Sequence, residues 1–197
     1  MAANQKFDTI SSRINEIKGM YTFLKSKSDD YVFSALCIKY SFFKNPSLVL
    51  SESELMDSIV DGTKDGGADF ILLDPNNNEA SDLVVGQAKY WKSFSLEDAK
   101  NAVNKMIDFF MQMRGCVFND FRPEVVSRFQ KVYAETGDES KYIFALYVSA
   151  PQNSIRIKTL KKIVEDRLGD EDKYELRVFS DRRLRKKLER LNLGDHM

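Results

Sequence analysis

The sequence predicts an α/β protein whose mixed β-sheet is flanked by helices. Helical and extended patterns alternate along the 197 residues, and a turn-rich segment separates two short apolar stretches of strand-forming residues. Alternating helices and strands are typical of a sheet covered by helices, whereas two strands joined by a turn form a hairpin. The two patterns together indicate a sheet that contains both kinds of connection.

Two helices are expected at the N-terminus. Apolar residues recur at helical spacing over residues 7–24 and again over residues 31–42. Pro46 follows the second pattern and cannot continue a helix, so the second helix is expected to end before it.

A short third helix is expected next. Ser51 and Glu54 have the spacing of a capping box, which predicts a helix through Val60. For residues 47–50 a short strand is the alternative. The following segment, 61–69, has the sequence DGTKDGGAD and is rich in turn-forming residues.

A β-hairpin is expected after this loop. Residues 70–73 are an apolar strand, residues 75–82 have the turn composition PNNNEASD, and residues 83–90 (LVVGQAKY) form a second strand. The short connection predicts that the two strands pair with each other.

The second half of the chain alternates helices and strands. Ser95 and Asp98 open a long amphipathic helix that Gly115 closes. The later expected elements are a helix over 123–135, a strand over 141–150, a basic helix over 155–168, a strand over 174–180 and a closing helix over 181–191.

Length and composition indicate one globular domain over residues 1–197. The N-terminal helices occupy 1–45, the hairpin and its neighbours form a core over 51–150, and 151–193 form a basic helix–strand–helix unit. Thirty basic residues balance thirty acidic ones and 43% of residues are hydrophobic, which excludes a disordered acidic tail and a histone-like binder.

Targeting and zinc signals are not found. The apolar stretches are far shorter than a membrane span, and the first residues lack the apolar centre of a secretory signal, so a cytoplasmic location is expected. Cys37 and Cys116 stand alone and the only histidine is His196, which argues against zinc sites and histidine-based catalysis.

The neutral net charge hides an acidic segment. Residues 51–82 contain nine acidic residues and one lysine, a net charge of −8 that the rest of the chain balances. A site for divalent cations inside a surface that attracts a polyanion has this distribution. A solvated acidic loop is the alternative.

Hairpin geometry predicts which polar groups meet. If Asp74 faces Asp82 across the turn, the antiparallel register places Asp69 opposite Gln87. Lys89 projects from the same face, beside the loop that carries Asp65. Both Asp69 and Lys89 are expected at the rim of a site rather than in the hydrophobic layer. A one-residue slip would separate these groups.

Such a set suits phosphodiester hydrolysis. A hard ion such as Mg²⁺, with Mn²⁺ as a substitute, takes carboxylate and amide oxygens, for which Asp69, Gln87 and Asp65 are the candidates. A lysine beside the ion stabilises charge at the attacked phosphate or orients the nucleophile. Asp69, Gln87 and Lys89 are therefore the candidate catalytic residues.

The segment DGGADFILLD followed by LVVGQAKY resembles the signature of the PD-(D/E)xK nuclease superfamily, in the variant with Gln in place of the acid of ExK, as in Mrr-like endonucleases. Asp69 matches the metal-binding Asp, Gln87 the Gln and Lys89 the Lys. Residues 51–91 resemble more narrowly the N-terminal nuclease domain of AIPR abortive-infection phage-resistance proteins, which show D-G-x-x-D-x-G-x-D before a QSKY-like strand.

The resemblance implies a restriction endonuclease-like three-layer fold, an Mg²⁺-dependent endonuclease acting on DNA, and a role in restriction or phage defence. Two departures stand out: no proline precedes Asp69, and the long C-terminal region usual in AIPR proteins is not present. A further acid commonly completes such sites, and Asp30 and Glu54 are the candidates.

Two other interpretations of the acidic loop fit its residues less well. An EF-hand counted from Asp61 or Asp65 lacks the glutamate at its last position, and Gly66-Gly67 lacks the GK[ST] of a phosphate loop. Asp57, Asp61 and Asp65, taken singly, are more typical of turns or caps than of ligands.

The closing helix carries Arg182, Arg183, Lys186 and Lys187, which are candidates for contacts to a phosphate backbone; a solvated face is the alternative. Trp91 is expected to pack beneath the neighbouring helix, with base stacking as the alternative. The expected partner is DNA, with RNA and a homodimer left open and no membrane involved. A catalytically inactive nuclease-fold module that binds nucleic acid or a protein is the second hypothesis.

Overall fold

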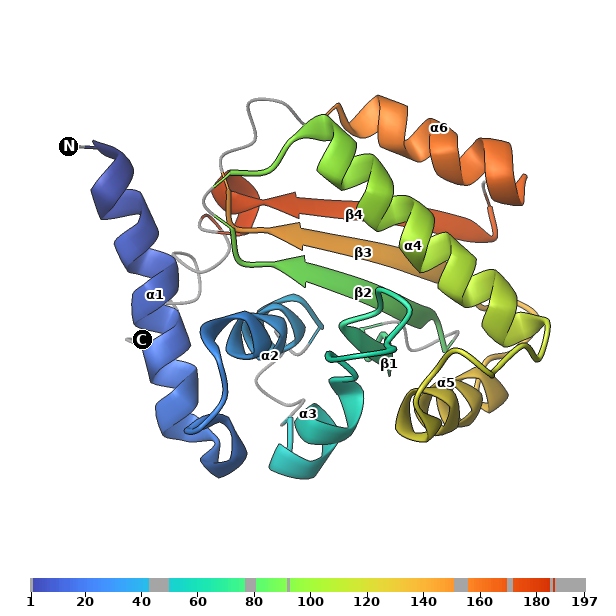
Figure 1. Ribbon diagram of the computed structural model, residues 1–197, viewed down its shortest axis with the longest axis horizontal. Coiled ribbons are helices and arrows are strands. Elements are labelled where there is room, and N and C mark those ends of the chain that lie inside the picture. The colour runs from blue at the N-terminus through green and yellow to red at the C-terminus, as the bar shows by residue number, and fades with distance from the viewer. Residues whose placement is uncertain are drawn as a thin grey trace.

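The computed structural model describes residues 2–42, 50–76, 81–91, 93–150, 156–169, 172–184 and 186 (Figure 1). The elements in chain order are α1 (Ala2–Met20), the 3₁₀ turn η1 (Thr22–Leu24), α2 (Asp29–Phe42), α3 (Glu52–Ser58), β1 (Phe70–Leu73), β2 (Leu83–Lys89), α4 (Leu96–Arg114), α5 (Pro123–Ala134), β3 (Tyr142–Val148), α6 (Ile157–Leu168) and β4 (Tyr174–Ser180). The order of helices and strands predicted from the sequence is therefore confirmed as far as β4, whereas the closing helix predicted over 181–191 lies largely outside the described residues.

Differences from the expected elements are confined to their ends. The first helix stops at Met20 because Tyr21 is extended, and Leu24 lies in η1. The alternative of a strand over 47–50 falls mainly on residues outside the described ranges. Residues 181–184 and Lys186 are helical, and Lys187 lies outside the described residues.

The four strands form a mixed sheet in the order β1-β2-β3-β4. β1 pairs antiparallel with β2, and β2, β3 and β4 are parallel. Phe70 faces Gly86, and the Asp74 amide donates to the Asp82 carbonyl at 2.8 Å, so the hairpin has the predicted register.

Helices cover both faces of this sheet, and alternate strand residues point to opposite layers. Ile71, Val85 and Phe144 pack in a core with α4, α5 and α6. Phe70 and Val84 pack on the other face with α1, α2 and α3. Figure 1 shows α4 crossing the strands in front of the sheet, with α6 beside it. Among the described residues, no helix is long and apolar enough to span a membrane.

The carboxyl ends of the parallel strands β2, β3 and β4 lie side by side at one end of the sheet. Lys89 at the end of β2 is in register with Val148 of β3, which is in register with Ser180 of β4. The basic residues Arg182 and Arg183 follow directly and are exposed. Two strand spacings, about 10 Å in all, therefore separate the end of β4 from the end of β2.

Gly86 provides a test of the hairpin packing. A Cβ atom at Gly86 would lie 1.9 Å from Phe70 Cζ, so an alanine would push this buried ring out of its core. We expect Gly86→Ala to lower the free energy of unfolding by about 3 kcal/mol in urea denaturation. Gly137→Ala is the control, because its Cβ would meet nothing within 4 Å. Equal stability of the two variants would contradict the described packing.

Candidate metal centre

The loop between α3 and β1 is closed by backbone hydrogen bonds. The Val60 amide donates to the Asp69 carbonyl at 2.9 Å, and the Asp69 amide donates to the Gly86 carbonyl at 2.8 Å. Gly66 and Gly67 adopt φ values of 69° and 84°, which other residues rarely adopt. The loop thereby turns back over the hairpin at the point where β1 begins.

Asp65 fixes the shape of this loop. Its carboxylate accepts hydrogen bonds from the amides of Gly62 at 3.0 Å and Gly67 at 2.7 Å. Asp65 thus stabilises a turn, as the sequence favours for this residue taken singly. Its half-buried carboxylate also lies close to those of Asp61 and Asp69.

Three carboxylates converge at the end of the hairpin. Asp61, Asp65 and Asp69 each offer an oxygen, and these oxygens lie within 4.8 Å of one another. Two oxygens bound to the same divalent ion at about 2.0–2.6 Å can be at most about 5 Å apart. The cluster therefore has the dimensions of a cation site.

Asp69 is buried, and the expectation that it lies at a rim is wrong. It is only 4% exposed, because the loop folds over it. The Ala88 amide donates to Asp69 Oδ2 at 2.7 Å, and Lys89 Nζ lies 3.3 Å from the same oxygen. Oδ1 accepts no hydrogen bond from the described residues. Lys89 is partly exposed, with 22% of its side chain accessible.

Burial raises the pKa of Asp69 to about 7, against an ordinary value of 3.8. The positive charge of Lys89 and the Ala88 amide act in the opposite direction, whereas Asp61 and Asp65 raise the pKa further. Burial also raises the pKa of Asp61, and Asp65 adds to this increase. The cluster is therefore short of positive charge.

The side-chain oxygen of Gln87 lacks a hydrogen-bond donor among the described residues. The side chain is 3% exposed and its Nε2 donates to the Gly67 carbonyl at 2.8 Å, which fixes the orientation of the amide. Oε1 is buried, and none of the described residues donates a hydrogen bond to it. An unsatisfied buried acceptor costs about 1–3 kcal/mol. A cation bound between this oxygen and the carboxylates would remove that cost.

The structure brings together four residues singled out in the sequence: Asp65, Asp69, Gln87 and Lys89. Of the two further acids considered, Asp30 is exposed at the start of α2 and its charge raises the pKa of Asp61. Glu54 instead bonds the amide and hydroxyl of Ser51 as part of the capping box of α3.

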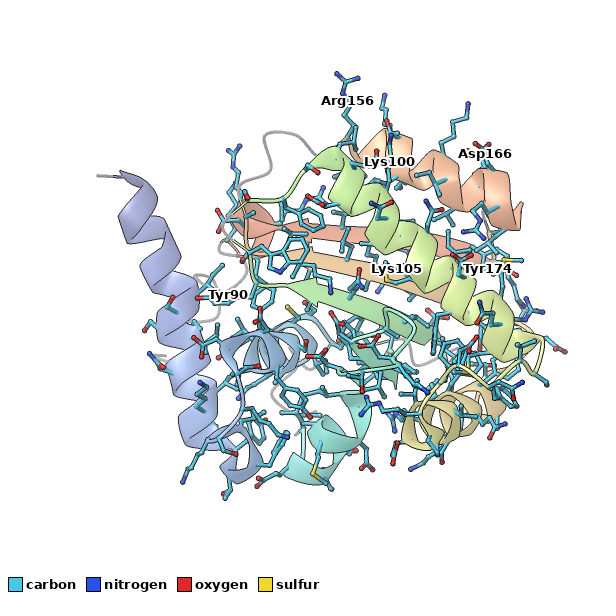
Figure 2. All side chains as sticks on the ribbon, in the orientation of Figure 1. Tyr90, Lys100, Lys105, Arg156, Asp166 and Tyr174 are labelled. Carbon is cyan, nitrogen blue, oxygen red and sulfur yellow. The ribbon has the colours of Figure 1, made fainter. Side chains whose placement is uncertain are left out.

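Sequence reasoning missed three residues. Asp61 is typical of a turn when taken singly, although its spacing of four residues from Asp65 and eight from Asp69 is a usable signal. Lys105 of α4 packs on Gly67, where an added Cβ would lie 2.9 Å from the lysine Cβ, and Figure 2 labels it in front of the sheet. Arg122, at the start of α5, donates to the carbonyls of Val60 and Asp61 and so holds the loop.

Cation binding is expected to depend on pH. Because the pKa of Asp69 is about 7, its carboxyl must release a proton when a cation binds at lower pH. We expect Mn²⁺ affinity, measured by calorimetry, to rise about tenfold for each pH unit up to about 7 and then to level off. A constant affinity from about pH 5.5 to 8 would contradict this.

Asp69→Asn is expected to raise the thermal stability of the metal-free protein and to abolish cation binding. The raised pKa of Asp69 means that the metal-free protein loses stability as pH rises from 3.8 through about 7. The amide is not ionised, so Asp69→Asn should unfold at a higher temperature than the wild type at about pH 8 and should not bind Mn²⁺. Asp166→Asn, on the exposed face of α6, should alter neither property.

Comparisons with known proteins add no assignment. No family model, curated protein or solved structure gives a significant match to this chain. What is established is a four-stranded mixed sheet flanked by helices that carries a buried acidic cluster. Any function must be inferred from the geometry of this cluster.

Proposed function

We propose that the protein is a divalent-metal-dependent endonuclease that hydrolyses phosphodiester bonds of DNA, in restriction or phage defence. The observation that carries the proposal is the buried Gln87 Oε1, which has no hydrogen-bond partner among the described residues and belongs to an amide anchored on Gly67 of the loop that carries three converging carboxylates. Structural ion-pair networks satisfy their buried oxygens, whereas this group leaves one oriented acceptor unused.

The donor set fits a hard cation. Asp61, Asp65, Asp69 and Gln87 offer only oxygen atoms, which favours Mg²⁺ or Mn²⁺ over zinc. When bound, such an ion polarises a phosphate oxygen and lowers the pKa of a coordinated water. Hydrolysis requires the oxygen of a water molecule to bond to phosphorus while one ester P–O bond breaks and its oxygen gains a proton.

Lys89 is suited to act on the phosphate itself. Its ammonium group is anchored 3.3 Å from Asp69 Oδ2 at the end of β2, and part of the side chain remains accessible. From this position it stabilises negative charge that develops on the phosphate in the transition state. Lys105 packs against Gly67 on the same side as the Gln87 amide and adds positive charge from α4.

The sequence resemblance supports the same proposal. Asp69 directly precedes the first strand of an antiparallel pair, and Gln87 and Lys89 lie at the end of the second strand, which is the order that the PD-(D/E)xK resemblance implies. A mixed sheet between two helical layers is also compatible with a restriction endonuclease-like fold.

DNA is the substrate class that the charge distribution favours. Arg182 and Arg183 come shortly after the carboxyl end of β4, which lies at the same end of the sheet as Lys89. Lys186 is exposed on the same segment. These cations offer contacts to a phosphate backbone near the acidic cluster. Arg183 also donates to the Val178 carbonyl at 3.2 Å, which anchors the start of the segment.

Cleavage of plasmid DNA tests the proposal. With Mg²⁺ or Mn²⁺ the wild type should cut, and EDTA should abolish cutting. Asp69→Asn and Lys89→Ala should each lower the rate about 100-fold or more, because each removes a group that stabilises the transition state.

Lys100→Ala and Asp166→Asn serve as controls for this experiment. Lys100 lies near the start of α4, where it pairs with Glu97, and Asp166 is exposed on α6; Figure 2 labels both residues. Both variants should cut at the wild-type rate. If the folded wild type binds Mn²⁺ and DNA but cuts none under any of these conditions, the protein is an inactive nuclease-fold module.

The basic segment yields a separate prediction about DNA binding. Changing Arg182, Arg183, Lys186 and Lys187 together to Gln should weaken binding of all sequences alike. It should also reduce the dependence of log K on log salt by about 0.9 for each phosphate that these side chains neutralise in the wild type. Fluorescence anisotropy at several salt concentrations measures both effects. An unchanged slope would show that the segment is only a solvated face.

A further inference from the structure

A pocket of about 760 Å³ adjoins the acidic cluster. It lies between the start of α2, the end of α3 and the start of α5, elements that Figure 1 shows near the loop that precedes β1. Its volume is within the range of about 300–1,000 Å³ that small-molecule sites occupy. Asp61 lines this pocket and also belongs to the acidic cluster, so the two sites share one wall.

The shared wall is held in place. Arg122 donates through one terminal nitrogen to the carbonyls of Val60 and Asp61, and its backbone amide donates to the Lys64 carbonyl. The same residue lines the pocket. The part of the loop that separates the pocket from the carboxylates is therefore held by hydrogen bonds from Arg122.

The pocket lining combines one aromatic ring, that of Tyr31, with side chains of both charges. The basic ones are Lys27, Arg122, Arg128 and Lys131, and the acidic ones are Asp57, Asp61 and Glu124. Tyr31 is half-buried, and the charges of Asp61 and Arg122 both act on its hydroxyl. Lys27 lies 4.9 Å from the centre of the Tyr31 ring. Lys131 of α5 is exposed in the pocket lining, and neither lysine forms an ion pair with the described part of the chain.

These features match the parts of a nucleotide. An aromatic ring stacks on a base, and lysines that form no ion pair with the described residues attract the phosphates that flank it. A paired base can enter a recess between helices only after it is flipped out of its stack, whereas an unpaired base avoids most of this energetic cost. A strand whose phosphate lies at the carboxylates places its next nucleotide beside Asp61.

We propose that this pocket receives one unpaired nucleotide of the DNA strand, next to the phosphate held at the Asp61–Asp65–Asp69 cluster. The inference rests on the proposed nuclease function and specifies its substrate: single-stranded DNA, or duplex DNA with an unpaired nucleotide at the cleaved position.

Nucleotide binding can be tested without cleavage. In protein with ¹³C-labelled methionine methyl groups, deoxyadenosine monophosphate should shift the Met56 signal, because Met56 lines the pocket and is 49% exposed. Met111, 48% exposed on α4, is the control and should not shift. Lys27→Ala combined with Lys131→Ala should weaken this binding about tenfold.

Strand binding supplies the second measurement. With Ca²⁺ in place of Mg²⁺, a fluorescein-labelled short single strand should bind wild-type protein more tightly than the matching duplex. Tyr31→Ala should weaken single-strand binding about tenfold and leave duplex binding unchanged, whereas Tyr31→Phe should bind like the wild type.

The outcomes separate this inference from the proposed function. Metal-dependent cutting with no Met56 shift and no effect of Tyr31→Ala would overturn the pocket assignment and keep the nuclease. The opposite result is a Met56 shift that requires Tyr31 and the two lysines in a protein that cuts no DNA. It would contradict the proposed nuclease function and show that the pocket binds free nucleotides. The inference that the pocket receives a nucleotide of a cleaved strand would then be wrong as well.

Discussion

A carboxylate held inside the protein is the constraint on which the hairpin region depends. Asp69 is almost completely shielded from water and sits beside two other acids, yet the described residues compensate it with only one amide and one lysine. Burial of an anion with so little compensation destabilises a fold. Such an arrangement persists where the site requires it, because an oriented anion next to a bound cation is no longer uncompensated.

Several backbone features serve this arrangement. The register that sets Phe70 opposite Gly86 directs Asp69 and Gln87 to the same face, and a slip of one residue would send them to opposite layers. Gly67 provides both the left-handed turn and the carbonyl that orients the Gln87 amide. Arg122 then fixes the far side of the loop. The hairpin register, the turn at Gly67 and the hydrogen bonds of Arg122 thus all hold the cluster in place, although the burial of its charge destabilises the fold.

The sequence was informative where a local rule decides the structure. Strand periodicity and the closing of the turn at Asp74 and Asp82 were enough to predict the register of the hairpin, which sets Phe70 opposite Gly86. The burial of Asp69 could not be foreseen, because it depends on how the loop folds back and on α4, whose Lys105 lies far along the chain. The same holds for Arg122 and for the pocket, which forms only when α2, α3 and α5 meet.

Charge imposes an order of events on any nucleic-acid chemistry here. Three carboxylates within 4.8 Å of one another repel a phosphate at close range, and Lys89 alone does not balance them. A divalent cation together with Lys89 offsets these three negative charges, after which the lysines of the pocket lining and Arg182, Arg183 and Lys186 act together with it. Because Asp61 belongs to both sites, a cation at the cluster also changes the field in the pocket. For the proposed nuclease, cation binding is therefore expected to precede productive binding of a strand, because a strand bound without a cation would contact only the basic surfaces.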